Sequence, residues 1–194
     1  DGMQMASNED VRVGQKITSA SNGMVGESVS QITVNLKRNY STTESYNITA
    51  YVWNSDGSVK STGSSIAQDT VQSGSYAEFR FTFGTPVSVA NGDLVGVGVN
   101  GGSADSSSVN VRLNGSNVDS TAVLYSWRSG AWKTNHFSGA ADMYLKSETS
   151  VPATWTWDFV AIGRGIFASG LHYNVIDYIT IATTGNATDF GDSL

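Results

Sequence analysis

Apolar and polar residues alternate with a period of two through most of residues 11–147. Such alternation is typical of β-strands with one buried and one wet face, because successive side chains of a strand point to opposite faces. The pattern predicts about eight short strands separated by polar turns. Their apolar positions include Val11, Val13, Ile32, Val34, Leu36, Ile48, Ala50, Val52, Phe79, Phe81, Phe83, Val95, Val97, Val99, Val109, Val111, Leu113, Leu124, Met143 and Leu145.

Turn sequences separate these runs. Asn54-Ser55-Asp56-Gly57 and Asn91-Gly92-Asp93 are typical of tight hairpin turns, because asparagine, aspartate and glycine adopt positive φ at low cost. A further hairpin is expected within residues 125–132, with aromatic residues at both of its ends. Many short strands with polar turns favour an all-β, antiparallel β-sandwich.

The expected order of the strands within the two sheets rests on a resemblance to known modules. The order of the strands around Val34, Phe81, Val97, Tyr125 and Tyr144 is similar to that of jelly-roll modules in secreted and viral proteins. This resemblance implies a jelly-roll β-sandwich over residues 1–147.

One predicted strand has glycine at its outward positions. Gly96 and Gly98 alternate with the apolar residues of the strand around Val97. A strand face without side chains lets another backbone or a large ring approach closely. We expect an aromatic ring from a neighbouring strand to cover these glycines, and a subunit contact is the alternative.

Composition narrows the classes of function. The chain has no cysteine, which excludes disulfides and thiolate metal sites. Its net charge is −6 and its basic residues are scattered, so the sequence predicts no nucleic-acid partner. No apolar run approaches the ~20 residues that a membrane-spanning helix needs, so no membrane span is expected.

The last part of the chain differs from the rest. Residues 148–154 are predicted to form a linker, and residues 155–194 an apolar, glycine-rich and β-rich segment. This segment is too short to enclose a core of its own. It must therefore pack on the sandwich or on other copies of the chain.

Within this segment, Arg164-Gly165-Ile166-Phe167, the strand-like run 177–181 and the turn-like run 185–192 form an unusual combination. It resembles a unit that occurs, usually in tandem, in structural proteins of marine, cyanophage-like bacteriophages. That resemblance implies a virion structural protein. The chain has a single copy of the unit, so we expect the unit to make oligomer or lattice contacts instead of a closed array.

The resulting expectation is a non-enzymatic protein at the virion surface, in a tail fibre, a spike or a capsid decoration. Its expected partners are other virion proteins, a host-surface glycan and further copies of itself, with a trimer favoured. The side chains expected to make assembly contacts are Trp155, Trp157, Phe159, Ile176, Tyr178 and Ile181.

Motifs for catalysis are not recognisable. His136 and His172 lie far apart in the sequence, and no Gly-x-Ser-x-Gly nucleophile motif is present. No carboxylate pair falls in a hydrolase motif. We therefore predict that the chain is not an enzyme and needs no cofactor. A structural Ca²⁺ at Asp56 or Asp93 is the one alternative, because jelly-roll modules often hold such an ion through loop oxygens.

Aromatic residues define a candidate binding site. Sugar rings stack on exposed aromatic faces, with polar side chains contacting their hydroxyls. The alternative is that the rings cap the sandwich or fill a subunit interface. A carbohydrate-binding module of a secreted or cell-surface protein, or a surface-filament subunit, is the competing function. The candidate residues are Trp53, Tyr125, Trp127, Trp132 and His136.

Overall fold

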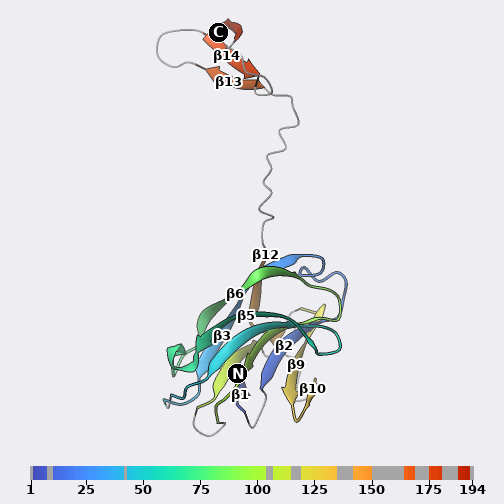
Figure 1. The fold of residues 1–194 in the computed structure, drawn as a ribbon, viewed down its shortest axis with the longest axis vertical. Helices are drawn as coiled ribbons and strands as arrows, with labels where there is room; N and C mark the ends of the chain where they lie inside the picture. The colour runs from blue at the N-terminus through green and yellow to red at the C-terminus, as the bar shows by residue number, and fades with distance from the viewer. Residues whose placement is uncertain are drawn as a thin grey trace. The chain divides into compact units, whose positions relative to one another are not determined.

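The computed structural model describes residues 2–7, 11–41, 43–103, 107–114, 119–134, 142–149, 164–168, 175–180 and 188–192. Two compact units make up the chain, residues 1–150 and residues 151–194. The regular elements among the described residues are β-strands, apart from one 3-10 turn, η1 (Gln68–Thr70) (Figure 1). Within this described part, no helix is long and apolar enough to cross a membrane.

The first unit contains two antiparallel sheets, which we call sheet A and sheet B (Figure 1). In sheet A, β1 pairs with β8, β8 with β3, and β3 with β6. The short strands β11 and β12 pair with β8 and β3. The strands of sheet A are β1 (Gly2–Met5), β3 (Ser28–Arg38), β6 (Ala77–Ser88), β8 (Val109–Asn114), β11 (Asp142–Met143) and β12 (Leu145–Thr149).

Sheet B has the strand order β10-β9-β2-β7-β4-β5. Each neighbouring pair is antiparallel. The strands of sheet B are β2 (Arg12–Ile17), β4 (Asn47–Trp53), β5 (Val59–Ala67), β7 (Leu94–Val99), β9 (Ala122–Arg128) and β10 (Ala131–Lys133).

One hydrophobic core lies between the two sheets. Val34 and Phe81 of sheet A, and Val52 and Val97 of sheet B, are fully buried in the same cluster. These are positions that the period-two pattern assigned to the inner face. The predicted all-β sandwich of two antiparallel sheets is therefore confirmed, with the core formed by the apolar side of each strand.

Three strands had no clear signal in the alternation. β5 is an edge strand of sheet B and leaves most of its residues exposed, so few apolar positions mark it. β1 has four residues, of which Met3 and Met5 are buried. β10 has three residues and completes the hairpin expected around Gly130. Short or edge strands bury little, so their alternation is weak.

The end of the sandwich extends beyond the expected boundary at residue 147. Strand β12 continues to Thr149, with Glu148 opposite Gln31 and Thr149 opposite Val29. Pairing with the long strand β3 holds these two polar residues in the sheet, although their sequence is typical of a linker. The other expected linker residues, 150–154, lie outside the described residues.

The second unit contains a three-stranded antiparallel sheet. Its order is β13 (Arg164–Ala168), β14 (Val175–Thr180) and β15 (Thr188–Asp192). The two strands expected from the motif are confirmed. Residues 188–192 were expected in a turn, and this was wrong, because they pair with β14 as a third strand. A register irregularity at Ile176 and Asp177 accommodates this glycine-containing strand.

The expected assembly residues are only partly described. Ile176 and Tyr178 lie on β14, the middle strand of this sheet. Trp155, Trp157, Phe159 and Ile181 lie outside the described residues.

Candidate functional site: the aromatic face of sheet B

Aromatic residues gather on the outer side of sheet B. Val52 and Val97 point into the core, so Tyr51 and Trp53 on β4 point outward. Leu124 likewise points inward, which leaves Tyr125 and Trp127 of β9 on the outer side. Trp132 is the cross-strand partner of Trp127 and shares its side of the sheet. We call this surface the aromatic face, and its members are Tyr51, Trp53, Tyr125, Trp127 and Trp132.

Glycines form the floor of the aromatic face. Gly14 on β2 is the cross-strand partner of Gly96 on β7. A Cβ atom on Gly14 would lie 3.3 Å from the Trp53 ring, and one on Gly98 would lie 3.3 Å from the Tyr51 ring. The expectation that an aromatic ring of a neighbouring strand covers these glycines is confirmed at Gly98, whereas the atoms nearest to Gly96 belong to the backbone of β2.

Four of the five rings form a continuous row, which runs from Tyr51 through Trp53 and Trp132 to Trp127. Tyr51 stacks on Trp53 with centroids 5.2 Å apart and an interplanar angle of 27°. Trp132 meets Trp53 edge-on at 4.9 Å and 71°, and it meets Trp127 at 5.6 Å and 78°. Offset and edge-to-face contacts of this kind are the favoured geometries of aromatic pairs. These four side chains therefore pack against one another on the outer side of sheet B, separately from the core between the sheets.

Two hairpin turns hold Trp132 in this row. In the β9–β10 turn, Ser129 and Gly130 both have positive φ, 53° and 79°, which is the pattern of a type I′ turn. The turn between β4 and β5 contains Gly57, with φ 86°. A Cβ on Gly57 would lie 2.8 Å from Trp132 Nε1, so this turn also packs on the indole.

The structure divides the predicted site residues into two groups. Trp53 has no exposed surface, so its ring cannot contact a ligand. It packs against the Trp132 ring instead. Tyr125, Trp127 and Trp132 are half-buried, so each of these residues leaves part of its surface in solvent. His136 lies outside the described residues.

Two cations flank the exposed rings. The Arg12 guanidinium lies 4.9 Å from the centroid of Trp127, and the Lys16 ammonium lies 5.3 Å from the centroid of Tyr125. Both distances are within the range of a cation–π interaction. Sequence reasoning missed these two residues, although the spacing Arg12-x-Gly14-x-Lys16 on one strand places all three on the same face.

The strands of sheet B carry no carboxylate. They contain five basic residues and no aspartate or glutamate, in a protein whose net charge is −6. Lys60 pairs with Asp93 of the adjacent turn at 2.6 Å. Arg12 and Lys16 form no ion pair with any described residue. The strands of sheet B therefore place two cations and no carboxylate beside the exposed rings, so this surface can combine ring stacking with the binding of negative charge.

The two loops considered for calcium use their oxygens in turns. Asp56 Oδ1 accepts hydrogen bonds from the Ser58 amide at 2.9 Å and the Ser58 hydroxyl at 2.6 Å, which lower the pKa of this carboxyl group. Asp93 Oδ2 accepts from the Ala90 amide at 2.9 Å and from Lys60. No group of three or more His, Cys, Asp or Glu side chains that could hold a metal occurs in the described part of the chain.

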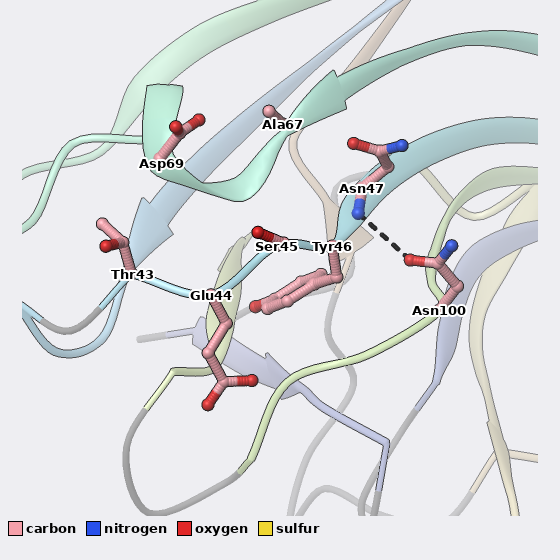
Figure 2. A pocket seen from close by; sticks show the side chains of 8 residues that line it. All are labelled: Thr43, Glu44, Ser45, Tyr46, Asn47, Ala67, Asp69 and Asn100. Atoms are coloured by element: carbon pink, nitrogen blue, oxygen red, sulfur yellow. Dashed lines mark hydrogen bonds between the residues drawn. The ribbon is translucent and has the colours of Figure 1, made fainter.

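A separate polar recess is lined by residues 43–47 together with Ala67, Asp69 and Asn100 (Figure 2). The Asn47 amide donates a hydrogen bond to Asn100 Oδ1 at 3.0 Å across it. The Tyr46 hydroxyl donates to the Ser107 carbonyl. Burial, reinforced by the charge of Glu44, raises the pKa of Tyr46 to about 12.

This tyrosine makes stability depend on alkaline pH. The raised pKa means that Tyr46 keeps its proton in the folded state after unfolded chains lose theirs near 10.0. Its contribution is complete below pH 10 and is lost as the pH rises through about 12. We expect the free energy of unfolding to fall in this window by up to about 1.4 kcal/mol per pH unit. Tyr46→Phe should flatten the fall in urea titrations, whereas an unchanged slope would contradict this assignment.

No protein-family model, no curated protein and no solved structure matches the chain.

Proposed function

We propose that the chain is a non-enzymatic structural protein of a bacteriophage particle, with the sandwich displayed for attachment to a glycan of the host surface. The aromatic face carries the attachment role. Tyr125, Trp127 and Trp132 are half-buried residues on paired strands of sheet B, and two cations lie beside them. Pre-positioned rings of this kind suit the stacking of sugar rings, because little side-chain freedom is lost on binding.

The proposal includes a jelly-roll topology for the sandwich. A jelly roll numbered along the chain places its eight strands in the orders 1-8-3-6 and 2-7-4-5. The pairings β1-β8-β3-β6 and β2-β7-β4-β5 support this topology. Strands β9 to β12 then extend the two sheets after the eighth strand.

The C-terminal unit supports the phage origin. The residues that resemble the phage unit form the paired strands β13 and β14, and β15 completes a small meander. A three-stranded meander of this size buries little surface by itself, so it needs a partner for stability. Contacts with further copies of the chain, with a trimer favoured, or with other virion proteins would meet that need.

Immunogold labelling tests the location. Antibody raised against the full chain should label purified phage particles from the source sample at a capsid or tail position. Label confined to cells or to loose filaments would overturn the virion proposal. It would favour the second candidate, a carbohydrate-binding or filament protein of a cell surface, which the same aromatic face supports.

Removal of the second unit tests its assembly role. A chain truncated after Ser150 keeps every strand of both sandwich sheets, so its circular dichroism and cooperative unfolding should be retained. We expect the full chain to be oligomeric and the truncated chain monomeric in light scattering after size exclusion at the same molar concentration. A truncated chain that still assembles would show that the sandwich holds the contacts.

A further inference from the structure

We propose that the aromatic face binds an anionic polysaccharide of a cell surface, one that carries sulfate or carboxylate groups, in preference to a neutral one. This inference rests on the attachment role proposed above and adds the chemical class of its ligand. It is argued from the charge, spacing and ring contacts of the described residues of sheet B.

Charge is the first argument. A carboxylate beside the rings would repel an anionic ligand, and the strands of sheet B contain none. Asp56 lies in the β4–β5 turn, next to Gly57, at the Trp132 end of the aromatic face. Sheet A differs, since Glu78 and Glu148 lie in its strands and Glu78 pairs with Lys146 at 2.6 Å. The chain as a whole is acidic, so a carboxylate-free sheet is a local feature. It favours an anionic partner through charge complementarity.

Spacing is the second argument. Arg12 and Lys16 are four residues apart on β2, which places their Cα atoms about 13 Å apart and their side chains on the same face. Gly14 lies between them, and its cross-strand partner Tyr125 stands between the two cations. An extended chain with repeated negative groups can contact both cations while its sugar rings lie along the row of aromatic side chains.

The ring contacts are the third argument. The Arg12 side chain lies over Trp127 and packs on Gly98, where a Cβ would lie 3.2 Å from Arg12 Cγ. Packing on two sides orients the guanidinium before a ligand arrives. An oriented guanidinium forms paired hydrogen bonds with carboxylate or sulfate oxygens. Lys16 over Tyr125 provides a second, less directional charge.

Affinity electrophoresis of the full chain tests the inference with two matched pairs of polymers. The first pair is dextran and dextran sulfate, and the second is hydroxyethylcellulose and carboxymethylcellulose. We expect retardation by the sulfated or carboxylated member of at least one pair, and much weaker retardation by its neutral counterpart. Retardation should decrease as salt is added, because exposed charges are screened over about 10 Å at 0.1 M.

Substitutions then assign the effect to the aromatic face. Arg12→Gln and Lys16→Gln should each weaken binding to the anionic polymer by roughly tenfold, the usual size of a lost charge-assisted hydrogen bond. Arg80→Gln and Lys146→Gln are matched controls, because they remove the same charges from exposed positions on sheet A. Neither control should change the retardation. Tyr125→Ala should weaken binding to the polysaccharide, and sodium polyacrylate should not be bound comparably.

The outcomes separate this inference from the proposed attachment role. Binding to a neutral polymer that Tyr125→Ala abolishes and Arg12→Gln leaves intact would overturn the anionic class and keep glycan attachment. Equal loss in the sheet A controls, or polyacrylate binding equal to that of the anionic polysaccharides, would show a general charge effect and also overturn the inference. Absence of binding to all four polysaccharides would count against both.

Discussion

The variant Gly96→Ala is expected to lose about 3 kcal/mol or more of its free energy of unfolding, at the upper end of the cost of overpacking. Its Cβ would press on the carbonyl oxygen of Val13 and lie 2.6 Å from the Cα of Gly14. These are backbone atoms of the adjacent strand β2, and they cannot rotate away as a side chain would. Relief requires that β2 and β7 separate at the centre of sheet B. For a domain stable by 5–15 kcal/mol, a loss of this size is a large fraction of the total.

Gly84→Ala is the matched control in another strand. A Cβ on Gly84 of β6 would meet no atom within 4 Å, and its φ is not in the left-handed region. Alanine there should be neutral or slightly stabilising, because it reduces the freedom of the unfolded chain. Urea unfolding of the two variants measures the difference. A Gly96→Ala protein as stable as Gly84→Ala would show that the close approach of β2 and β7 is not required.

The variant Trp53→Ala is expected to cost about 3–5 kcal/mol, the usual range for truncating a buried tryptophan. Trp53 has no exposed surface, and its ring lies between Tyr51 and Trp132 above Gly14. Its removal would leave a cavity that the glycine floor cannot fill. Because Trp53 Nε1 is buried without an acceptor among the described residues, the loss should fall toward the lower end of this range.

Tyr40→Ala is the control for this truncation. Tyr40 is 42% exposed, so its loss should change stability by no more than about 0.5 kcal/mol. Near-ultraviolet circular dichroism of Trp53→Ala should also lose the signal of the ordered aromatic row. Equal stabilities of the two variants would show that the aromatic row contributes nothing to the folded state.

These experiments separate two roles within the aromatic face. Trp53 contributes to packing alone. Trp132 contributes to packing, because it contacts Trp53, and is also a candidate for binding, because it is only half-buried. Trp132→Ala would therefore change both stability and binding. Tyr125 and the two cations lie beside this row, so their substitution tests binding with less effect on the packing.

Much of the fold could be predicted from the sequence because burial of one face of a strand makes apolar residues recur at every second position. The inner-face positions, such as Val34 and Ile48, alternate with polar residues because the core excludes water from only one side of each strand. Edge strand β5 left little record because most of its residues stay in solvent. Strand β15 was missed because pairing with β14 outweighs the low strand propensity of aspartate and glycine.

The candidate site was only half predictable. Its aromatic residues and the glycines of β7 were visible in the sequence, and the expectation that a ring covers these glycines is confirmed at Gly98. The division into a buried Trp53 and half-exposed Tyr125, Trp127 and Trp132 was not visible. Arg12 and Lys16 were also missed, because their neighbours on the face come from β9, more than 100 residues later.

The sequence by itself determined the all-β class, most strand positions and the inner side of each strand, because these follow from local alternation and turn chemistry. Only the tertiary structure decided which strands adjoin and therefore which outward residues share a surface. Outward side chains obey no periodic rule that distinguishes a solvated ring from one packed on a neighbour. The meeting of Trp53, Gly14 and Trp132 depends on strand order and on two hairpin turns, which are properties of the whole sheet.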